Sequence, residues 1–249
     1  RSGNFAITAD ARIDNRDALI KTFDVRKPDD RPITDTELIL EAYKRWGRDC
    51  PKKLLGAFSF AVWNAQSRAL MLARDHLGIR PLYYVHRPGK FFAFASEEKA
   101  LVEAGFSQGS ANDLRIASFL LVPVQIEPEA TFWKDISSAR RASTLEVTRD
   151  GEVNFEQYWS LDPDREIELS SDEAYAERFR ELFQEAVRCR MRTTTPISAA
   201  LSGGLDSTSI ACVAARKSKR KIQTLSAVFP SVPRSVEVPC SYISDAADE

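Results

Sequence analysis

Six consecutive residues, Ser202-Gly203-Gly204-Leu205-Asp206-Ser207, most constrain how this chain can fold. An apolar run, Ile197 to Leu201, precedes them, and a helical pattern from about Thr208 to Lys217 follows. A second apolar run then extends from Ile222 to Val228. Two buried runs joined by a helix are typical of the strand, helix, strand unit of a parallel sheet. The chain is therefore expected to contain the start of an α/β domain.

The chemistry of this glycine loop suits a phosphate. A loop between a strand and a helix gathers backbone N–H groups and the positive end of the helix at one point. Gly203 and Gly204 allow a close backbone approach, while Ser202 and Ser207 offer hydroxyl donors. Asp206 would repel a bare phosphate, so a bridging Mg²⁺ is expected. The loop lacks the pattern of a Walker A motif, and a tight turn without a ligand remains the alternative.

Composition excludes several classes of protein. Lys plus Arg number 35 and Asp plus Glu 36, so no net field attracts nucleic acid or an anionic membrane. No apolar stretch is long enough to span a membrane. The four cysteines are widely spaced and form no Cys-x-x-Cys pair, which argues against zinc and disulfides and favours a reducing cytoplasm. A strand pattern already begins at Phe5, so we expect an internal fragment of a longer protein.

Residues 1–105 alternate short strands with one clear helix. The expected strands, all rich in aromatic and aliphatic residues, are Phe5–Ala11, Ala57–Asn64, Ala69–Asp75, Leu82–Val85 and Phe91–Ala95. The pattern Thr34-Asp35-Thr36-Glu37 predicts a capping box, because the Thr hydroxyl and the Glu carboxylate can each bind a free backbone N–H. The helix that follows should end at Gly47.

The rest of the chain divides into a connection and a second domain. Residues 106–165 are less regular, contain a hairpin turn at Asp150-Gly151 and are expected to connect the domains. A second domain is expected over 166–249, with a capping box formed by Ser170 and Glu173. Its first helix should bury a stripe made of Tyr175, Phe179, Leu182, Phe183, Ala186 and Val187.

Two motifs resemble one enzyme family. The segment Leu201 to Ser207 resembles the PP-loop of N-type ATP pyrophosphatases, which release pyrophosphate from ATP while they adenylate a substrate. The segment Arg74 to Tyr84, followed by Phe94 to Leu101, resembles the glutaminase half of asparagine synthetases. The resemblance implies an α/β chain: an α+β N-terminal-nucleophile glutaminase-type sandwich, without its N-terminal part, and then the start of a parallel-sheet ATP-pyrophosphatase domain.

The resemblance also implies roles for single residues. Those matching ATP and pyrophosphate contacts are Leu201, Ser202, Gly203, Gly204, Asp206, Ser207 and Val228, with Asp206 as the Mg²⁺ ligand. Leu201 and Val228 fit simple sheet core equally well. Asp35 matches a contact to the amine of glutamine, although a carboxylate also stabilises the first turn of a helix. The family's nucleophilic Cys and synthetase base have no counterpart, so no catalytic residue is expected within this chain.

The oxyanion-hole segment departs from the family. It usually reads Asn-Gly-Glu-Ile-Tyr-Asn, whereas this chain has Asp10-Ala11-Arg12-Ile13-Asp14-Asn15. An Asn side chain would donate a hydrogen bond to the developing oxyanion, but the carboxylate of Asp10 opposes it, so weak or absent glutaminase activity is predicted. The altered pattern at Asp10 and Ala11 resembles asparagine-synthetase relatives that cyclise lasso peptides.

Three functions therefore stay open. The first is an asparagine synthase that uses ATP, Mg²⁺, aspartate and glutamine, and the second is a lasso-peptide cyclase that acts on a precursor peptide without glutaminase activity. The third is a non-catalytic remnant that binds ATP. A homodimer is compatible with each of them.

Overall fold

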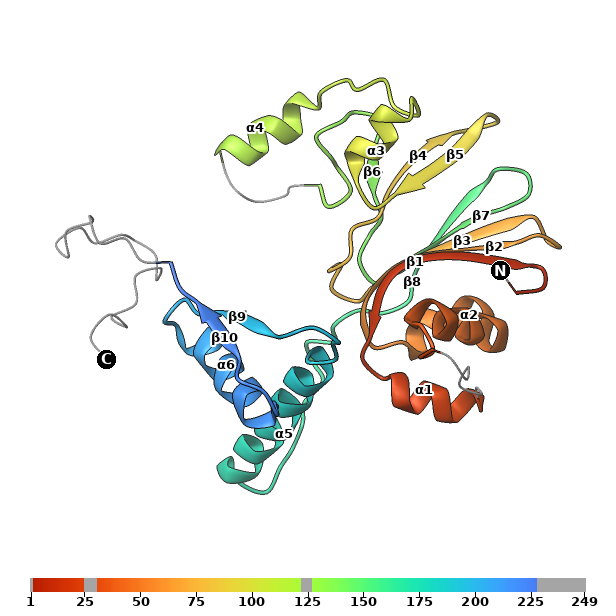
Figure 1. Cartoon of the computed structure of the whole chain (residues 1–249). Helices are drawn as coiled ribbons and strands as arrows, with labels where there is room; N and C mark the ends of the chain where they lie inside the picture. The colour runs from red at the N-terminus through yellow and green to blue at the C-terminus, as the bar shows by residue number, and fades with distance from the viewer. Residues whose placement is uncertain (1, 25–30, 122–126, 228–249) are drawn as a thin grey trace. The chain divides into compact units, whose positions relative to one another are not determined.

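The computed structural model describes residues 2–24, 31–121 and 127–227 (Figure 1). The chain separates into two compact units, Arg1–Asp164 and Arg165–Glu249. The helices of the first unit are α1 (Arg16–Phe23), α2 (Asp35–Trp46), the 3₁₀ helix η1 (Gly47–Lys53), α3 (Glu98–Glu103) and α4 (Asp113–Leu121). Its strands are β1 (Phe5–Ile13), β2 (Gly56–Asn64), β3 (Ala69–Arg74), β4 (Tyr83–Arg87), β5 (Phe91–Ala95), β6 (Ser137–Ser138), β7 (Ser143–Val147) and β8 (Val153–Gln157).

Two antiparallel sheets form the first unit. The larger has the strand order β1-β2-β3-β7-β8, and the smaller has the order β5-β4-β6. All five expected strands are present, with ends that shift by one or two residues at most. The interval 106–165, expected as a connection, instead supplies β6, β7 and β8 to these sheets. Short strands such as β7 carry little periodicity of their own, so their pairing with β3 decides the structure.

The central strands of the larger sheet, β2 and β3, are buried on both faces. Along β2, Phe58, Phe60 and Val62 pack with α1 and α2 in one core cluster, which also contains Leu38 of α2. The intervening Ala61 belongs to a second cluster, shared with residues of the smaller sheet such as Phe94. Figure 1 shows both helices on one face of the larger sheet. This period-two alternation is what the strand pattern predicts.

Local turn chemistry in the first unit follows the sequence. The Thr34 hydroxyl accepts from the amide of Glu37 at 3.2 Å, and the Glu37 carboxylate accepts from the amide of Thr34 at 2.8 Å. Gly47, with φ +54°, follows the last residue of α2. The amide of Gly151, with φ +85°, donates to the carbonyl of Thr148 at 3.0 Å and closes the β7–β8 hairpin. The capping box, the helix end and the hairpin turn are all confirmed.

The second unit contains α5 (Asp172–Arg190), β9 (Ser198–Ala200), α6 (Leu205–Lys217) and β10 (Gln223–Leu225). Strands β9 and β10 pair in parallel, which confirms the predicted strand, helix, strand arrangement. Helix α6 begins at Leu205, inside the glycine loop, rather than near Thr208. In the described residues, no helix is long and apolar enough to cross a membrane.

Helix α5 differs from its prediction in two ways. Its cap is Ser171, whose hydroxyl accepts from the amide of Ala174 at 3.3 Å, so the box expected between Ser170 and Glu173 is wrong by one residue. The expected buried stripe is also wrong, because Val187 is its only buried member, whereas Phe179 is 68% exposed. Among the described residues of this unit, only α6 and two three-residue strands could cover α5.

Candidate functional site

The glycine loop connects β9 to α6 with a defined geometry. The amide of Leu201 donates to the carbonyl of Leu225 at 2.8 Å, which holds the start of the loop to β10. Gly203 adopts φ +82°, a left-handed conformation that favours glycine. The hydroxyls of Ser202 and Ser207 lie 3.0 Å apart, and the Ser207 hydroxyl accepts from the amide of Ser202 at 3.2 Å. The loop therefore folds back on itself and brings its two serines together.

The N-terminus of α6 is open to an anion. Gly204 occupies the cap position, and no side chain caps this end of the helix. The first amides of a helix have no partner within the helix, and here they lie beside the paired hydroxyls of Ser202 and Ser207. Gly204 has an ordinary φ of −76°, and a Cβ added there would meet the Ser202 hydroxyl at 3.6 Å, an ordinary contact. The strict requirement for glycine lies at Gly203 alone.

Asp206 stands exposed in the first turn of α6. Within the described parts of the chain, no group of three His, Cys, Asp or Glu side chains could hold a metal ion by itself. A single carboxylate fits Mg²⁺ only where phosphate oxygens and water complete its coordination. The donor set thus fits an ion that arrives with a nucleotide. Leu201 is half-buried at the base of the loop, and Val228 lies outside the described residues.

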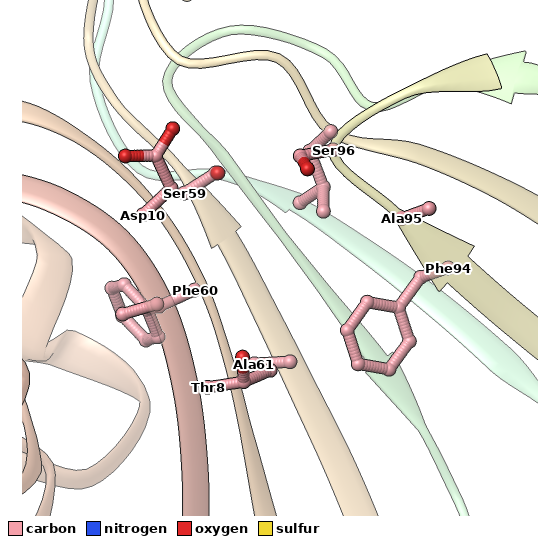
Figure 2. A pocket seen from close by; sticks show the side chains of 10 residues that line it. Thr8, Asp10, Ser59, Phe60, Ala61, Phe94, Ala95 and Ser96 are labelled. Carbon is pink, nitrogen blue, oxygen red and sulfur yellow. The ribbon is translucent and has the colours of Figure 1, made fainter. Parts of the chain in front are cut away.

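A cavity of about 350 Å³ forms in the first unit (Figure 2). Its lining comes from both sheets and consists of Thr8, Ala9, Asp10, Ser59, Phe60, Ala61, Leu82, Phe94, Ala95 and Ser96. Asp10 of β1 lies directly opposite Ser59 of β2, so both side chains point to the same face of the sheet. Ala11 packs on the other face, against the helix-side core. Of the two positions that the resemblance assigns to an altered oxyanion hole, only Asp10 lines the cavity.

Arg80 is the charged partner of Asp10. Its Nε lies 3.4 Å from Oδ1 of Asp10, and the two side chains are 39% and 45% exposed. The sequence pattern did not single out this residue, since Arg80 lies in the turn between β3 and β4, far along the chain from β1. Ser59 was missed for a similar reason, because only the strand register places it opposite Asp10.

Asp35, the expected glutamine-amine contact, lies outside the cavity lining. Its carboxylate forms an ion pair with Arg16 and accepts from the amide of Ile13 at 3.2 Å. Its side chain is only 11% exposed. Asp35 thus joins the end of β1 to α1, and it lies in the first turn of α2.

The turn from Arg74 to Arg80 is organised by the half-buried side chain of Arg74 and the buried side chain of Asp75. The carboxylate of Asp75, fully buried, accepts from four backbone amides, those of Phe58, Leu77, Ile79 and Arg80. The guanidinium of Arg74 donates to the carbonyls of Gly78, Arg80 and Ala139 and to the hydroxyl of Ser138. Burial lowers the pKa of Arg74 from its usual value. Both side chains hold main-chain groups, so the turn is a rigid support for Arg80.

Comparison with known proteins indicates the family to which this chain belongs. The sequence profile of the glutamine amidotransferase domain matches residues 1–159, and that of asparagine synthase matches residues 178–246. The chain is 31% identical to asparagine synthetase [glutamine-hydrolyzing] 3 of Bacillus subtilis over 215 residues, which cover 86% of the chain and 34% of that protein. It is also 31% identical to asparagine synthetase [glutamine-hydrolyzing] 1 of B. subtilis over 185 residues, 73% of the chain and 28% of that protein.

The chain spans about a third of the length of these curated relatives. Among solved structures, the glutamine phosphoribosylpyrophosphate amidotransferase of B. subtilis aligns over 94% of this chain and 48% of its own, with 15% identity and a TM-score of 0.45. The antiparallel sandwich and the parallel strand, helix, strand unit described above agree with the two profiles in their order along the chain. The chain belongs to the glutamine amidotransferase domain family and continues into asparagine-synthase sequence.

Proposed function

We propose that this chain is part of an ATP-dependent, amide-forming ligase of the asparagine-synthase type. In this reaction the side-chain carboxylate of aspartate is adenylated with release of pyrophosphate, and ammonia derived from glutamine then displaces AMP to give asparagine. The observation that carries the proposal is the uncapped N-terminus of α6, beside the paired hydroxyls of Ser202 and Ser207. It stands in a chain that carries both family matches.

In this proposal the glycine loop binds the phosphates that leave as pyrophosphate. The first amides of α6 and the hydroxyls of Ser202 and Ser207 donate hydrogen bonds to phosphate oxygens. Asp206 would hold the Mg²⁺ that accompanies the nucleotide, and the metal would supply positive charge beside the leaving pyrophosphate. Leu201 and Val228 remain proposed contacts to the adenine and ribose, and Asp35 remains a proposed contact to glutamine.

A second candidate function is favoured by one observation. Asp10 places a carboxylate in the cavity of the first unit, where the family has an amide donor. A lasso-peptide cyclase would need no glutamine hydrolysis, because the amine of its own precursor peptide attacks the adenylate. Both candidates share the adenylation step and differ in the amine donor and in the acceptor carboxylate.

The test is ATP–pyrophosphate exchange with the full-length protein, with aspartate and then a precursor peptide as acceptor. Asp206→Asn should lower the aspartate-dependent exchange rate by roughly 10²-fold, because it removes the charge that binds the metal. Asp172→Asn is the matched control, since Asp172 is an exposed carboxylate in the first turn of α5. Exchange at the wild-type rate in Asp206→Asn would remove the metal assignment.

The wild-type protein separates the remaining functions. Exchange that depends on a peptide but not on aspartate would favour the cyclase. ATP binding without exchange, whatever the acceptor, would instead indicate a non-catalytic remnant.

A further inference from the structure

The contact between Arg80 and Asp10 is an ion pair without a hydrogen bond. The 3.4 Å between Nε of Arg80 and Oδ1 of Asp10 exceeds the roughly 2.7–2.9 Å of a charge-assisted hydrogen bond. Nε of Arg80 is buried and has no hydrogen-bond partner in the described structure. Arg80 therefore acts on Asp10 through its charge, while the lone pairs of Asp10 stay available on the cavity side.

The main chain of Arg80 is held on both sides. Its amide donates to Oδ2 of Asp75 at 2.9 Å, and its carbonyl accepts from Nε of Arg74 at 2.8 Å. These bonds fix where the Arg80 side chain begins and leave its guanidinium to reach β1. The turn thus delivers a positive charge to Asp10, which lines the cavity.

Ser59 shows that this end of the cavity is built for a polar group. The residue is only 4% exposed, lines the cavity and lies directly opposite Asp10 in the strand register. Figure 2 shows its oxygen beside the carboxylate of Asp10, with the ring of Phe94 across the cavity. Most of the remaining lining residues, such as Phe60, Leu82 and Phe94, are apolar, so a charge on Asp10 that lacked a partner would act on any group bound there.

We propose that Arg80 is a positioning residue that acts through Asp10. Its positive charge balances the carboxylate, so that the cavity tolerates the negative charge that develops on the carbonyl oxygen of a bound carboxamide. This inference rests on the proposed function, in which the carboxamide is the side chain of glutamine. Asp10 alone would oppose the reaction, and Arg80 limits that opposition.

The experiment is a double-mutant cycle in the full-length protein, with glutamate release from glutamine as the readout. Arg80→Met should lower kcat by roughly 5–10-fold and change KM by less than about threefold, because solvent screens part of the interaction between two side chains that are 39% and 45% exposed. Asp10→Asn should raise kcat. In the Asp10→Asn background, Arg80→Met should change kcat by less than about threefold, because no carboxylate remains to be balanced. Arg68→Met, at an exposed turn residue, is the control.

Two results in the cycle would overturn the inference. One is a wild-type kcat in Arg80→Met. The other is an equal loss in both backgrounds, since Arg80 would then act directly or only on folding. Circular dichroism melting and ATP–pyrophosphate exchange of the same preparations report whether each variant is folded.

If the wild-type protein releases no glutamate from glutamine, the inference is tested by titration calorimetry with L-glutamate. The side-chain carboxylate of glutamate carries a negative charge, like the oxyanion that would develop on a bound carboxamide. Weaker binding to Arg80→Met than to wild type, with the difference lost in the Asp10→Asn background, supports the inference. Equal binding or no binding overturns it. ATP–pyrophosphate exchange that is absent from the wild-type protein counts against the proposed function alone, because the exchange does not involve this cavity.

Discussion

Asp75→Asn should be the most damaging conservative substitution in the first unit. Oδ1 of Asp75 accepts from the amides of Leu77 and Ile79, at 3.1 and 3.0 Å, and Oδ2 accepts from those of Phe58 and Arg80, at 3.2 and 2.9 Å. An Asn side chain keeps one oxygen and turns an NH₂ group towards the other two amides. Because a hydrogen bond to a charged group contributes about 1.5–3 kcal/mol, losing two lowers the free energy of unfolding by about 3–6 kcal/mol.

That loss is a large share of the roughly 5–15 kcal/mol that stabilises a typical domain. At roughly 2–4 °C per kcal/mol for a unit of this size, a loss of about 3–6 kcal/mol should lower the melting temperature by about 6–24 °C. Circular dichroism melting measures the shift, and amide hydrogen exchange locates it at the four donors. Asp150→Asn, at the exposed β7–β8 turn, is the control. A loss below about 1 kcal/mol, or unchanged protection of the Arg80 amide, would refute this account of the turn.

Two further predictions concern titratable groups. Hydrogen bonds from Arg31 and from the amide of Thr34 lower the pKa of Glu37 from 4.5 to about 2, so its stabilising effect is complete above pH 4.5 and is lost as the pH falls towards 2. Urea unfolding at pH 7 should therefore show Glu37→Gln to be less stable than wild type, by less than about 1 kcal/mol because the Arg31–Glu37 ion pair is half-exposed. The same difference in the free energy of unfolding at pH 2 would contradict this. Burial raises the pKa of Cys50 to about 12, so at pH 8 iodoacetamide should modify the exposed Cys212 and reach Cys50 only in urea. Peptide mass spectrometry measures both sites, and equal labelling without urea would show that Cys50 is accessible.

Part of the candidate chemistry could be predicted from neighbouring residues alone. The capping box at Thr34, the helix end at Gly47 and the strand, helix, strand order around the glycine loop all follow from short-range rules. The loop residues and the unusual Asp10 were likewise visible in the sequence. Each of these features depends on backbone conformation or hydrogen bonding within a few positions.

Other features depend on contacts between distant segments. Residues 143–157 contain two strands that complete the larger sheet, because pairing with β3, rather than their own periodicity, determines them. The apolar stripe of α5 is mostly exposed, because burial depends on which surfaces are available to cover a helix. A periodic pattern predicts a helix or a strand, but it does not say what the apolar face will contact.

The cavity of the first unit shows most clearly which properties follow from the sequence and which depend on contacts between distant segments. From the sequence, Asp10 is a carboxylate where a hydrogen-bond donor was expected, and its charge alone predicts poor stabilisation of an oxyanion. The strand register adds the hydroxyl of Ser59, and the turn held by Arg74 and Asp75 adds the balancing charge of Arg80. The sequence determines which residue types are present at this site. Only the tertiary structure brings the charges of Asp10 and Arg80 together, because charges interact through space rather than along the chain.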